Sequence, residues 1–213
     1  MKGVVVDGFV IEGPTAGGHN APPRGELVID ETGQPVYGER DVVDLAKMSE
    51  LGLPFWLAGG TGSPEGLQAA LDAGAAGIQV GTLFAYTDES GIAPDIKRQV
   101  IAQVRAGTTD VVTDARASPT GFPFKVVGLE GTNSEAEQYG KRERVCDLGY
   151  LRNAYRREDG RIGYRCAAEP VDTFLKKEGD PGETAGRKCL CNGLMANIGH
   201  AQVRDGEAER ALL

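Results

Sequence analysis

Three short apolar segments, each followed by a glycine-containing loop, constrain the fold of this chain more than any other feature. They cover residues 4–11, 55–58 and 76–80, and the first is a mainly β-branched run interrupted only by Asp7 and Gly8. Such runs are typical of strands buried on both faces, as strands of parallel sheets are. We therefore expect three strands of one parallel sheet.

Helical patterns lie between and after these strands. Residues 64–73 show apolar side chains at helical spacing, with Ser63 as the expected N-cap and a proline at the first position. A second helix is expected to start from Asp41 as its N-cap and to end near Gly52, and a third to cover residues 94–105. This alternation predicts parallel α/β units with right-handed crossovers.

Other parts of the chain break the pattern. Residues 27–30 and 35–37 flank a Thr-Gly pair, which predicts a small hairpin. Residues 118–124 are expected to form a loop, and the charged, glycine-interrupted sequence beyond them predicts short helices and coil. We therefore divide the chain into a β/α region, residues 1–130, and an irregular, mainly α/coil extension, residues 131–213.

Composition argues against several classes of partner. The formal net charge of −8 at pH 7 repels phosphate backbones, so no nucleic-acid binding is expected. No run of about 18 apolar residues occurs, so no membrane partner is expected. Four cysteines are too few for a disulfide scaffold in 213 residues, which favours a cytoplasmic protein with reduced thiols.

The first candidate for chemistry is His19, which follows two glycines in the loop after the first predicted strand. Ligands of parallel α/β folds bind at the carboxyl ends of the strands. Glycines allow close approach of the backbone to a ligand, and an imidazole can act as a general base near neutral pH. The alternative is a loop histidine that only hydrogen-bonds its neighbours.

The second candidate is a phosphate site. Gly59 and Gly60 follow the second predicted strand, and Gly81 and Thr82 follow the third. Glycine loops can direct backbone N–H groups at an oxyanion, and the helix that follows Ser63 adds the positive end of its dipole. The alternative is that these glycines only form tight turns. Because two consecutive strands end in such loops, the phosphate site is the preferred interpretation.

Three sequence blocks resemble the nitronate monooxygenase (2-nitropropane dioxygenase) family. They are Gly17-Gly18-His19, residues 57–60 and residues 77–84, and their order and spacing are specific as a set. The resemblance implies a TIM-type (β/α)8 barrel that binds FMN and oxidises nitronates or nitroalkanes with O2. It also implies that His19 is the catalytic base. The FMN-binding residues that it implies are Gly18, Gly59, Gly60, Gln79, Gly81 and Thr82.

The resemblance is closer still to longer members of the family with a C-terminal extension, through residues 118–124, 146–150 and 186–192. In such a barrel the phosphate loops follow strands seven and eight. The chain is therefore expected to hold the C-terminal part of the barrel, about three β/α units, and to be a fragment of a longer enzyme or a truncated gene product. Three parallel strands cannot close a barrel, so we expect the chain alone to be marginally stable or to self-associate through the open face. We also expect its FMN binding to be weak or absent.

Two other functions stay open at this point. The same barrel supports flavin-dependent enoyl reductases, which reduce an activated double bond with NAD(P)H. The chain could also be an inactive remnant whose extension is a structural or partner-binding module. Fold alone does not separate these functions from nitronate oxidation.

The four cysteines are the last candidates, as metal ligands. Cys146, Cys166, Cys189 and Cys191 all lie in the extension. The Cys-x-Cys pair is tighter than the usual spacing in zinc sites, and the other gaps are long. Reduced, merely buried thiols are therefore the preferred interpretation, and no metal site is predicted.

Overall fold

The computed structural model describes residues 5–213 and contains a parallel three-stranded sheet at its N-terminal end. The strands are β1 (Phe9–Glu12), β2 (Phe55–Ala58) and β3 (Gly77–Gln79), in the order β1-β2-β3. Their register pairs Glu12 with Ala58, and Ala58 with Gln79, so all three strands end at the same edge. The chain is thus an α/β protein with a parallel sheet, as expected.

The first strand is shorter than predicted, because the expected strand began at Val4, which lies outside the described residues. Pairing starts only at Phe9, which is opposite Phe55, and Val5 is 89% exposed. Residues 5–8 have no strand beside them in the described chain, so they do not extend β1.

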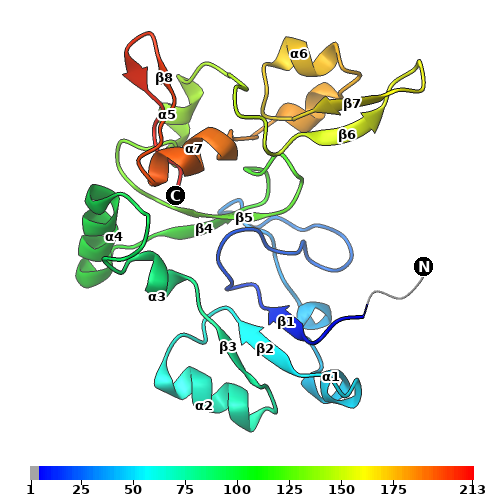
Figure 1. The fold of residues 1–213 in the computed structure, drawn as a ribbon, viewed down its shortest axis with the longest axis vertical. Coiled ribbons are helices and arrows are strands. Elements are labelled where there is room, and N and C mark those ends of the chain that lie inside the picture. The colour runs from blue at the N-terminus through cyan, green and yellow to red at the C-terminus, as the bar shows by residue number, and fades with distance from the viewer. Residues whose placement is uncertain (1–4) are drawn as a thin grey trace.

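Two helices cover one face of the sheet (Figure 1). They are α1 (Leu45–Glu50) and α2 (Pro64–Asp72). The core between them and the strands is built around the buried side chains Phe55, Ala70 and Ala75. Half-buried apolar residues complete it: Phe9, Ile11, Leu45, Met48, Leu57 and Ile78.

The opposite face of the sheet carries the alternate side chains. Val10, Trp56 and Gly77 lie in one row across the three strands. The Trp56 ring lies against glycines on both sides, since a Cβ at Gly8 or Gly77 would come 2.8 and 3.2 Å from its atoms. Val10 is 49% exposed, so apolar surface remains on this face.

The helix caps match the sequence at α2 but not at α1. Ser63 accepts the amide hydrogen of Gly66 and caps α2, as predicted. The prediction that Asp41 caps α1 is wrong, because Asp44 is the N-cap and accepts from the amide of Lys47. Asp41 belongs instead to a 3-10 helix, η1 (Glu39–Asp41), where its carboxylate binds nearby amides.

Two helices and a hairpin follow the sheet. The helices are α3 (Thr82–Ala85) and α4 (Pro94–Ala106), and the latter confirms the third predicted helix. The strands β4 (Val111–Asp114) and β5 (Phe124–Val127) pair antiparallel, a hairpin that was not predicted. The hairpin predicted over residues 27–37 is reduced to a single bridge between Ile29 and Pro35.

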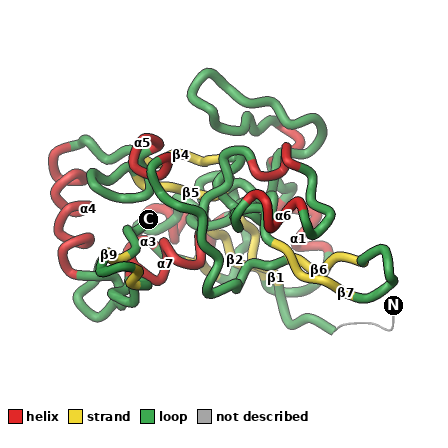
Figure 2. Tube along the Cα trace, turned by 90° about the horizontal axis from the view of Figure 1, so that it is seen from above, coloured by secondary structure: helices red, strands yellow, loops and turns green. Residues whose placement is uncertain are grey.

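The C-terminal region is made of short elements joined by loops, and the β6–β7 hairpin projects from the body in both views (Figures 1 and 2). Its helices are α5 (Ala136–Gly140), α6 (Val171–Leu175), η2 (Pro181–Thr184) and α7 (Leu190–Asn197). Its strands are β6 (Asn153–Arg156), β7 (Ile162–Arg165), β8 (Val203–Arg204) and β9 (Glu207–Ala208). The extension therefore contains two small antiparallel hairpins that the prediction of helix and coil missed.

The C-terminal region shares a core with the central hairpin. Phe124 and Val126 of β5 pack with Leu190 of α7 and with Leu212, which is fully buried. The amide of Val127 also donates to the carbonyl of Leu213. The last residues of the chain are thus held against β5.

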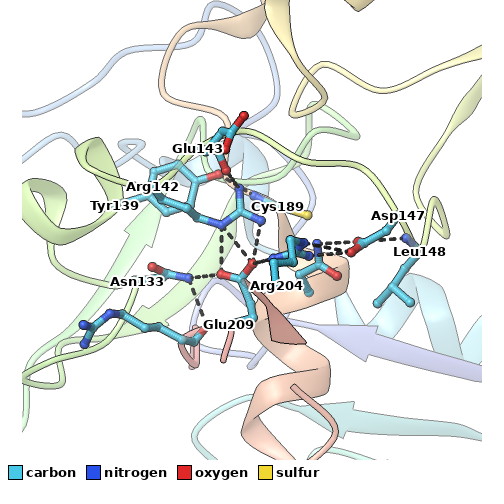
Figure 3. Close-up of polar contacts among 11 residues, drawn as sticks. Asn133, Tyr139, Arg142, Glu143, Asp147, Leu148, Cys189, Arg204 and Glu209 are labelled. Atoms are coloured by element: carbon cyan, nitrogen blue, oxygen red, sulfur yellow. Dashed lines mark hydrogen bonds and ion pairs between the residues drawn. The ribbon is translucent and has the colours of Figure 1, made fainter. Parts of the chain in front are cut away.

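A buried ionic network joins the loops of this region (Figure 3). Glu209 lies between Arg142, which binds it with two nitrogens, and Arg204, and Asn133 donates to it from a third side. The Glu209 side chain is 3% exposed. Arg204 also pairs with Asp147, so the network joins residues 133–147 to the β8–β9 hairpin.

No helix among residues 5–213 is long and apolar enough to cross a membrane.

Candidate active site

The loops that follow β1, β2 and β3 lie together at the carboxyl edge of the sheet. The amide of Gly13, just after β1, donates to the carbonyl of Ala58 at the end of β2. A Cβ at Gly59 would lie 2.6 Å from the Ala16 nitrogen and 2.9 Å from Thr15 Oγ1. The β1 and β2 loops are therefore in direct contact, and only glycine fits at the crossing.

The β2 and β3 loops also meet. A Cβ at Gly62 would lie 3.4 Å from Val80, in the β3 loop, and 3.3 Å from Leu83, at the start of α3. The amides of Gly60, Gly62 and Gly81 have no hydrogen-bond acceptor among residues 5–213. Both loops can therefore offer backbone donors to a ligand at this edge.

The predicted phosphate-site residues all belong to these loops or to the strand ends beside them. Gly59 and Gly60 have φ values of 99° and 71°, and their turn leads to the capped N-terminus of α2. Gly81 is the N-cap of α3, and Thr82 is exposed at the first position of that helix. Gln79 is the last residue of β3 and is exposed. This set presents N–H and hydroxyl donors, which suit an oxyanion.

His19 lies in the β1 loop, but its backbone pairs with β5. The amide of Asn20 donates to the carbonyl of Pro123, and the amide of Lys125 donates to the carbonyl of Gly18. His19 thereby forms a bridge opposite Phe124, and the two rings stand edge to face with centroids 4.8 Å apart. The Asn20 side chain donates to the carbonyl of Ala16, which links this segment to the β2 loop.

The His19 ring is held through one nitrogen. Nε2 lies 2.7 Å from Ser118 Oγ, and Ser118 is fully buried. Ser118 Oγ lies 2.7 Å from Thr120 Oγ1, and either hydroxyl can donate. Nδ1 has no hydrogen-bond partner among residues 5–213. Burial lowers the pKa of His19, so the imidazole is neutral near pH 7 and one nitrogen can accept a proton.

Sequence reasoning did not find Ser118 and Phe124 as partners of His19. Residues 118–124 are predicted only as a loop, because no local pattern predicts a contact between two residues that are 99 positions apart. Glycine and proline spacing marks turns but does not specify which distant segment a loop contacts.

Two of the four cysteines, Cys146 and Cys191, come from segments that are in contact. A hydrogen bond from Asn192 to Asp147 brings the neighbourhoods of Cys191 and Cys146 together. All four cysteines are free thiols, and burial raises the pKa of Cys166 to about 11. Among residues 5–213, no three Cys, His, Asp or Glu side chains are arranged to hold a metal ion.

Comparisons with known proteins place the chain in a family. A family model described as nitronate monooxygenase matches residues 1–128. The chain is 30% identical over 161 residues to a probable nitronate monooxygenase of Staphylococcus saprophyticus, which covers 74% of this chain and 42% of that protein. It is 31% identical over 124 residues to a Mycobacterium tuberculosis protein, covering 58% of this chain and 30% of that protein. That protein is named (3aS,4S,5R,7aS)-5-hydroxy-7a-methyl-1-oxo-octahydro-1H-indene-4-carboxyl-CoA dehydrogenase.

The chain thus spans between 30% and 42% of the length of these relatives. The matched region, residues 1–128, includes the parallel sheet, the loops at its carboxyl edge and the His19 segment with its partners on β5. It makes up more than half of the 213 residues. The chain belongs to the nitronate monooxygenase family.

Proposed function

We propose that this chain supplies the phosphate site and the catalytic base of an FMN-dependent oxidoreductase that oxidises nitronates or nitroalkanes with O2. The observation that carries the proposal is the meeting of three loops at one sheet edge. The β1 loop touches Gly59 through Ala16, and Ala16 is tied by its carbonyl to Asn20, the neighbour of His19. Anion donors and a candidate base are therefore parts of one connected structure.

The residues at this edge fit the phosphate group of FMN. Gly60, Gly62 and Gly81 offer amides without acceptors among the described residues, and Thr82 adds an exposed hydroxyl. The N-terminus of α2, which is nine residues long, adds its positive dipole end. Gly18 and Gln79 are proposed to contact the rest of the cofactor. Bound FMN would supply the two-electron oxidation of the substrate and the transfer of those electrons to O2.

His19 is proposed to accept the proton from the carbon next to the nitro group of a neutral nitroalkane. This role needs the tautomer in which Nε2–H donates to Ser118 Oγ, while Ser118 donates to Thr120. Nδ1 then has a free lone pair and takes up the proton. The Nε2–H bond to Ser118 is the same before and after proton uptake, so the ring need not move.

The parallel sheet fits one part of a larger (β/α)8 barrel. α1 and α2 cover one face of β1–β3, as barrel helices cover the outside of the strands. The face with Val10 and Trp56 would then point into the barrel interior. We propose that further strands, or a second copy of the chain, cover this face.

Substitution of His19 tests the base assignment. In the flavin-loaded protein, His19→Asn is expected to lower kcat/KM for a neutral nitroalkane by roughly 10²–10⁴-fold. Turnover of a nitronate, which has already lost this proton, should fall much less. For the unsubstituted protein, kcat/KM for the nitroalkane should decrease as the pH falls through the lowered pKa of His19, because the protonated ring cannot accept a proton. Equal losses for both substrates would contradict the assignment.

A second candidate function comes from the relatives. Two of them, from Mycobacterium tuberculosis and Rhodococcus jostii, are named as carboxyl-CoA dehydrogenases. A CoA thioester also makes the hydrogens on the carbon next to its carbonyl more acidic, so the same base could remove one of them. Anaerobic reduction of the flavin by an acyl-CoA, without oxygen uptake on nitronate, would favour this function. Bleaching of the flavin by NAD(P)H alone would favour an enoyl reductase.

A further inference from the structure

The loop that carries Ser118 is bound along its carbonyls by a segment of the C-terminal region. Arg187 Nη1 donates to the carbonyl of Arg116 at 2.9 Å and to the carbonyl of Ser118 at 2.7 Å. The backbone amide of Lys188 donates to the carbonyl of Ala117 at 2.8 Å. Three consecutive carbonyls thus receive hydrogen bonds from two consecutive residues.

The same loop is bound by its amides on the other side. The Asp114 carboxylate accepts from the amides of Arg116 and Ala117 at 2.8 and 2.9 Å. A Cβ at Gly186 would lie 3.1 Å from the Arg116 side chain, so the two segments are in close contact. Ser118 therefore has little freedom to move relative to residues 186–188.

Arg187 is suited to this task because its guanidinium is half-buried and charged. Its Nε also donates to the carbonyl of Glu183, so the side chain is fixed at both ends of the guanidinium. Burial lowers the pKa of Arg187, but an arginine stays protonated in proteins. Hydrogen bonds from a charged donor are stronger than those between neutral groups.

We propose that Arg187 is a positioning residue for His19, acting through Ser118. By fixing the Ser118 backbone, Arg187 determines the position of Ser118 Oγ, which binds His19 Nε2. The position of this oxygen in turn determines the direction in which Nδ1 points. Arg187 lies outside the region that the family model matches, residues 1–128, so the C-terminal region takes part in building the site. The proposal rests on the proposed function only for the role of His19 as the base.

Nuclear magnetic resonance of the histidine rings tests the proposal without a cofactor. The chain contains two histidines, His19 and the exposed His200, so the ring signals are few and His200 is an internal control. His19 should show the Nε2–H tautomer, a ring-current shift from Phe124 and a pKa below about 6.5. In Ser118→Ala the ring loses its hydrogen-bond partner at Nε2, so the preference for the Nε2–H tautomer and the ring-current shift from Phe124 should both decrease.

Arg187→Gln is expected to change the His19 signals in the same direction as Ser118→Ala, with His200 unchanged. Arg144→Gln is the matched control, since Arg144 is also half-buried and binds two carbonyls, those of Ala167 and Thr184, without touching residues 116–118. It should leave the His19 signals at their original values. Arg187→Lys, which keeps the charge but not the planar fork, should give an intermediate result.

Two results would overturn the proposal: unchanged His19 signals in folded Arg187→Gln, or an equal change in Arg144→Gln. If the glutamine variant does not fold, unchanged His19 signals in Arg187→Lys have the same meaning. In the flavin-loaded protein, Arg187→Gln should lower kcat by ~10- to 100-fold with little change in KM. If Arg187→Gln moves the His19 signals but His19→Asn leaves turnover intact, positioning stands and the base assignment fails.

Discussion

At the scale of single residues, the site depends on a close backbone crossing that only glycine permits. Gly59 has a φ of 99°, and its missing Cβ leaves room for the Ala16 nitrogen. The crossing brings the loop of the candidate base against the candidate phosphate loop. A side chain there would separate the two loops, so Gly59 links the two halves of the proposed chemistry.

Gly59→Ala is expected to destabilise the chain by about 1–3 kcal/mol, from backbone strain and from contact with Ala16. Chemical denaturation measures this change. Gly52→Ala is the matched control, because Gly52 also has a positive φ, 70°, but a Cβ there has open space. An equal loss in both variants would mean that strain, and not the crossing, determines the cost at Gly59.

At the scale of elements, local sequence signals place α2 in the proposed phosphate site. Ser63 caps the helix, Pro64 takes its first position and Glu65 lies in its first turn. Ser63 accepts one of the free amide hydrogens of the first turn, and Pro64 has no amide hydrogen that needs an acceptor. Together they fix the N-terminus of the helix next to the glycine loop. The position of the dipole is therefore determined by a few adjacent residues.

Ser63→Ala is expected to cost about 1 kcal/mol of unfolding free energy, since the Gly66 amide loses its acceptor. Ser63→Asp should retain most of the stability, because aspartate caps helices equally well. Thermal or urea unfolding of the two variants gives the comparison. A loss in Ser63→Asp as large as in Ser63→Ala would show that the cap is not the source of the effect.

At the scale of the whole molecule, the C-terminal region is held to the rest by buried polar contacts as well as by apolar packing. Glu209 binds Arg142, Arg204 and Asn133 at a point where loops distant in sequence meet. Leu212 is buried nearby against β5 and α7. Arg187 and Lys188, which bind the Ser118 loop, precede α7 in this same region. The integrity of this region and the order of the His19 site are thus linked.

Glu209→Gln is expected to destabilise the chain by about 3–5 kcal/mol, because Arg142 loses its counter-charge in a largely buried place and Arg204 keeps only Asp147. Burial alone would raise the pKa of Glu209, but the hydrogen bonds and charge of Arg142, with Asn133 and Arg204, lower it. The carboxylate therefore stabilises the fold above its unfolded pKa of about 4.3, and this contribution is lost as the pH falls through the lower folded value.

Unfolding measured at neutral pH and at pH values near 3 should show a smaller difference between Glu209→Gln and the original chain at the lower pH. Asp159→Asn serves as a control, since the Asp159–Arg161 pair is exposed and is expected to contribute little. A pH-independent difference for Glu209→Gln would contradict the ionic explanation.

The amino-acid sequence alone is sufficient to predict the three parallel strands, α2 with its cap, α4 and the loop positions of Gly18, His19, Gly59 and Gly60. These follow from periodicity and turn chemistry, which act over a few neighbouring residues. The start of α1 was misplaced because Asp41 and Asp44 are both acceptable caps, and the fold used Asp44. The β4–β5 hairpin was missed because its strands are short and separated by a long loop.

Only the tertiary structure decided what His19 contacts. Its glycine neighbours and its place after β1 are local features, and the sequence predicts them. Its partners Ser118 and Phe124 come from a hairpin about 100 residues away, which is in turn bound by Arg187 and packed on Leu212. Such long-range pairings depend on how the separate segments pack together, and no local pattern of side chains specifies that packing.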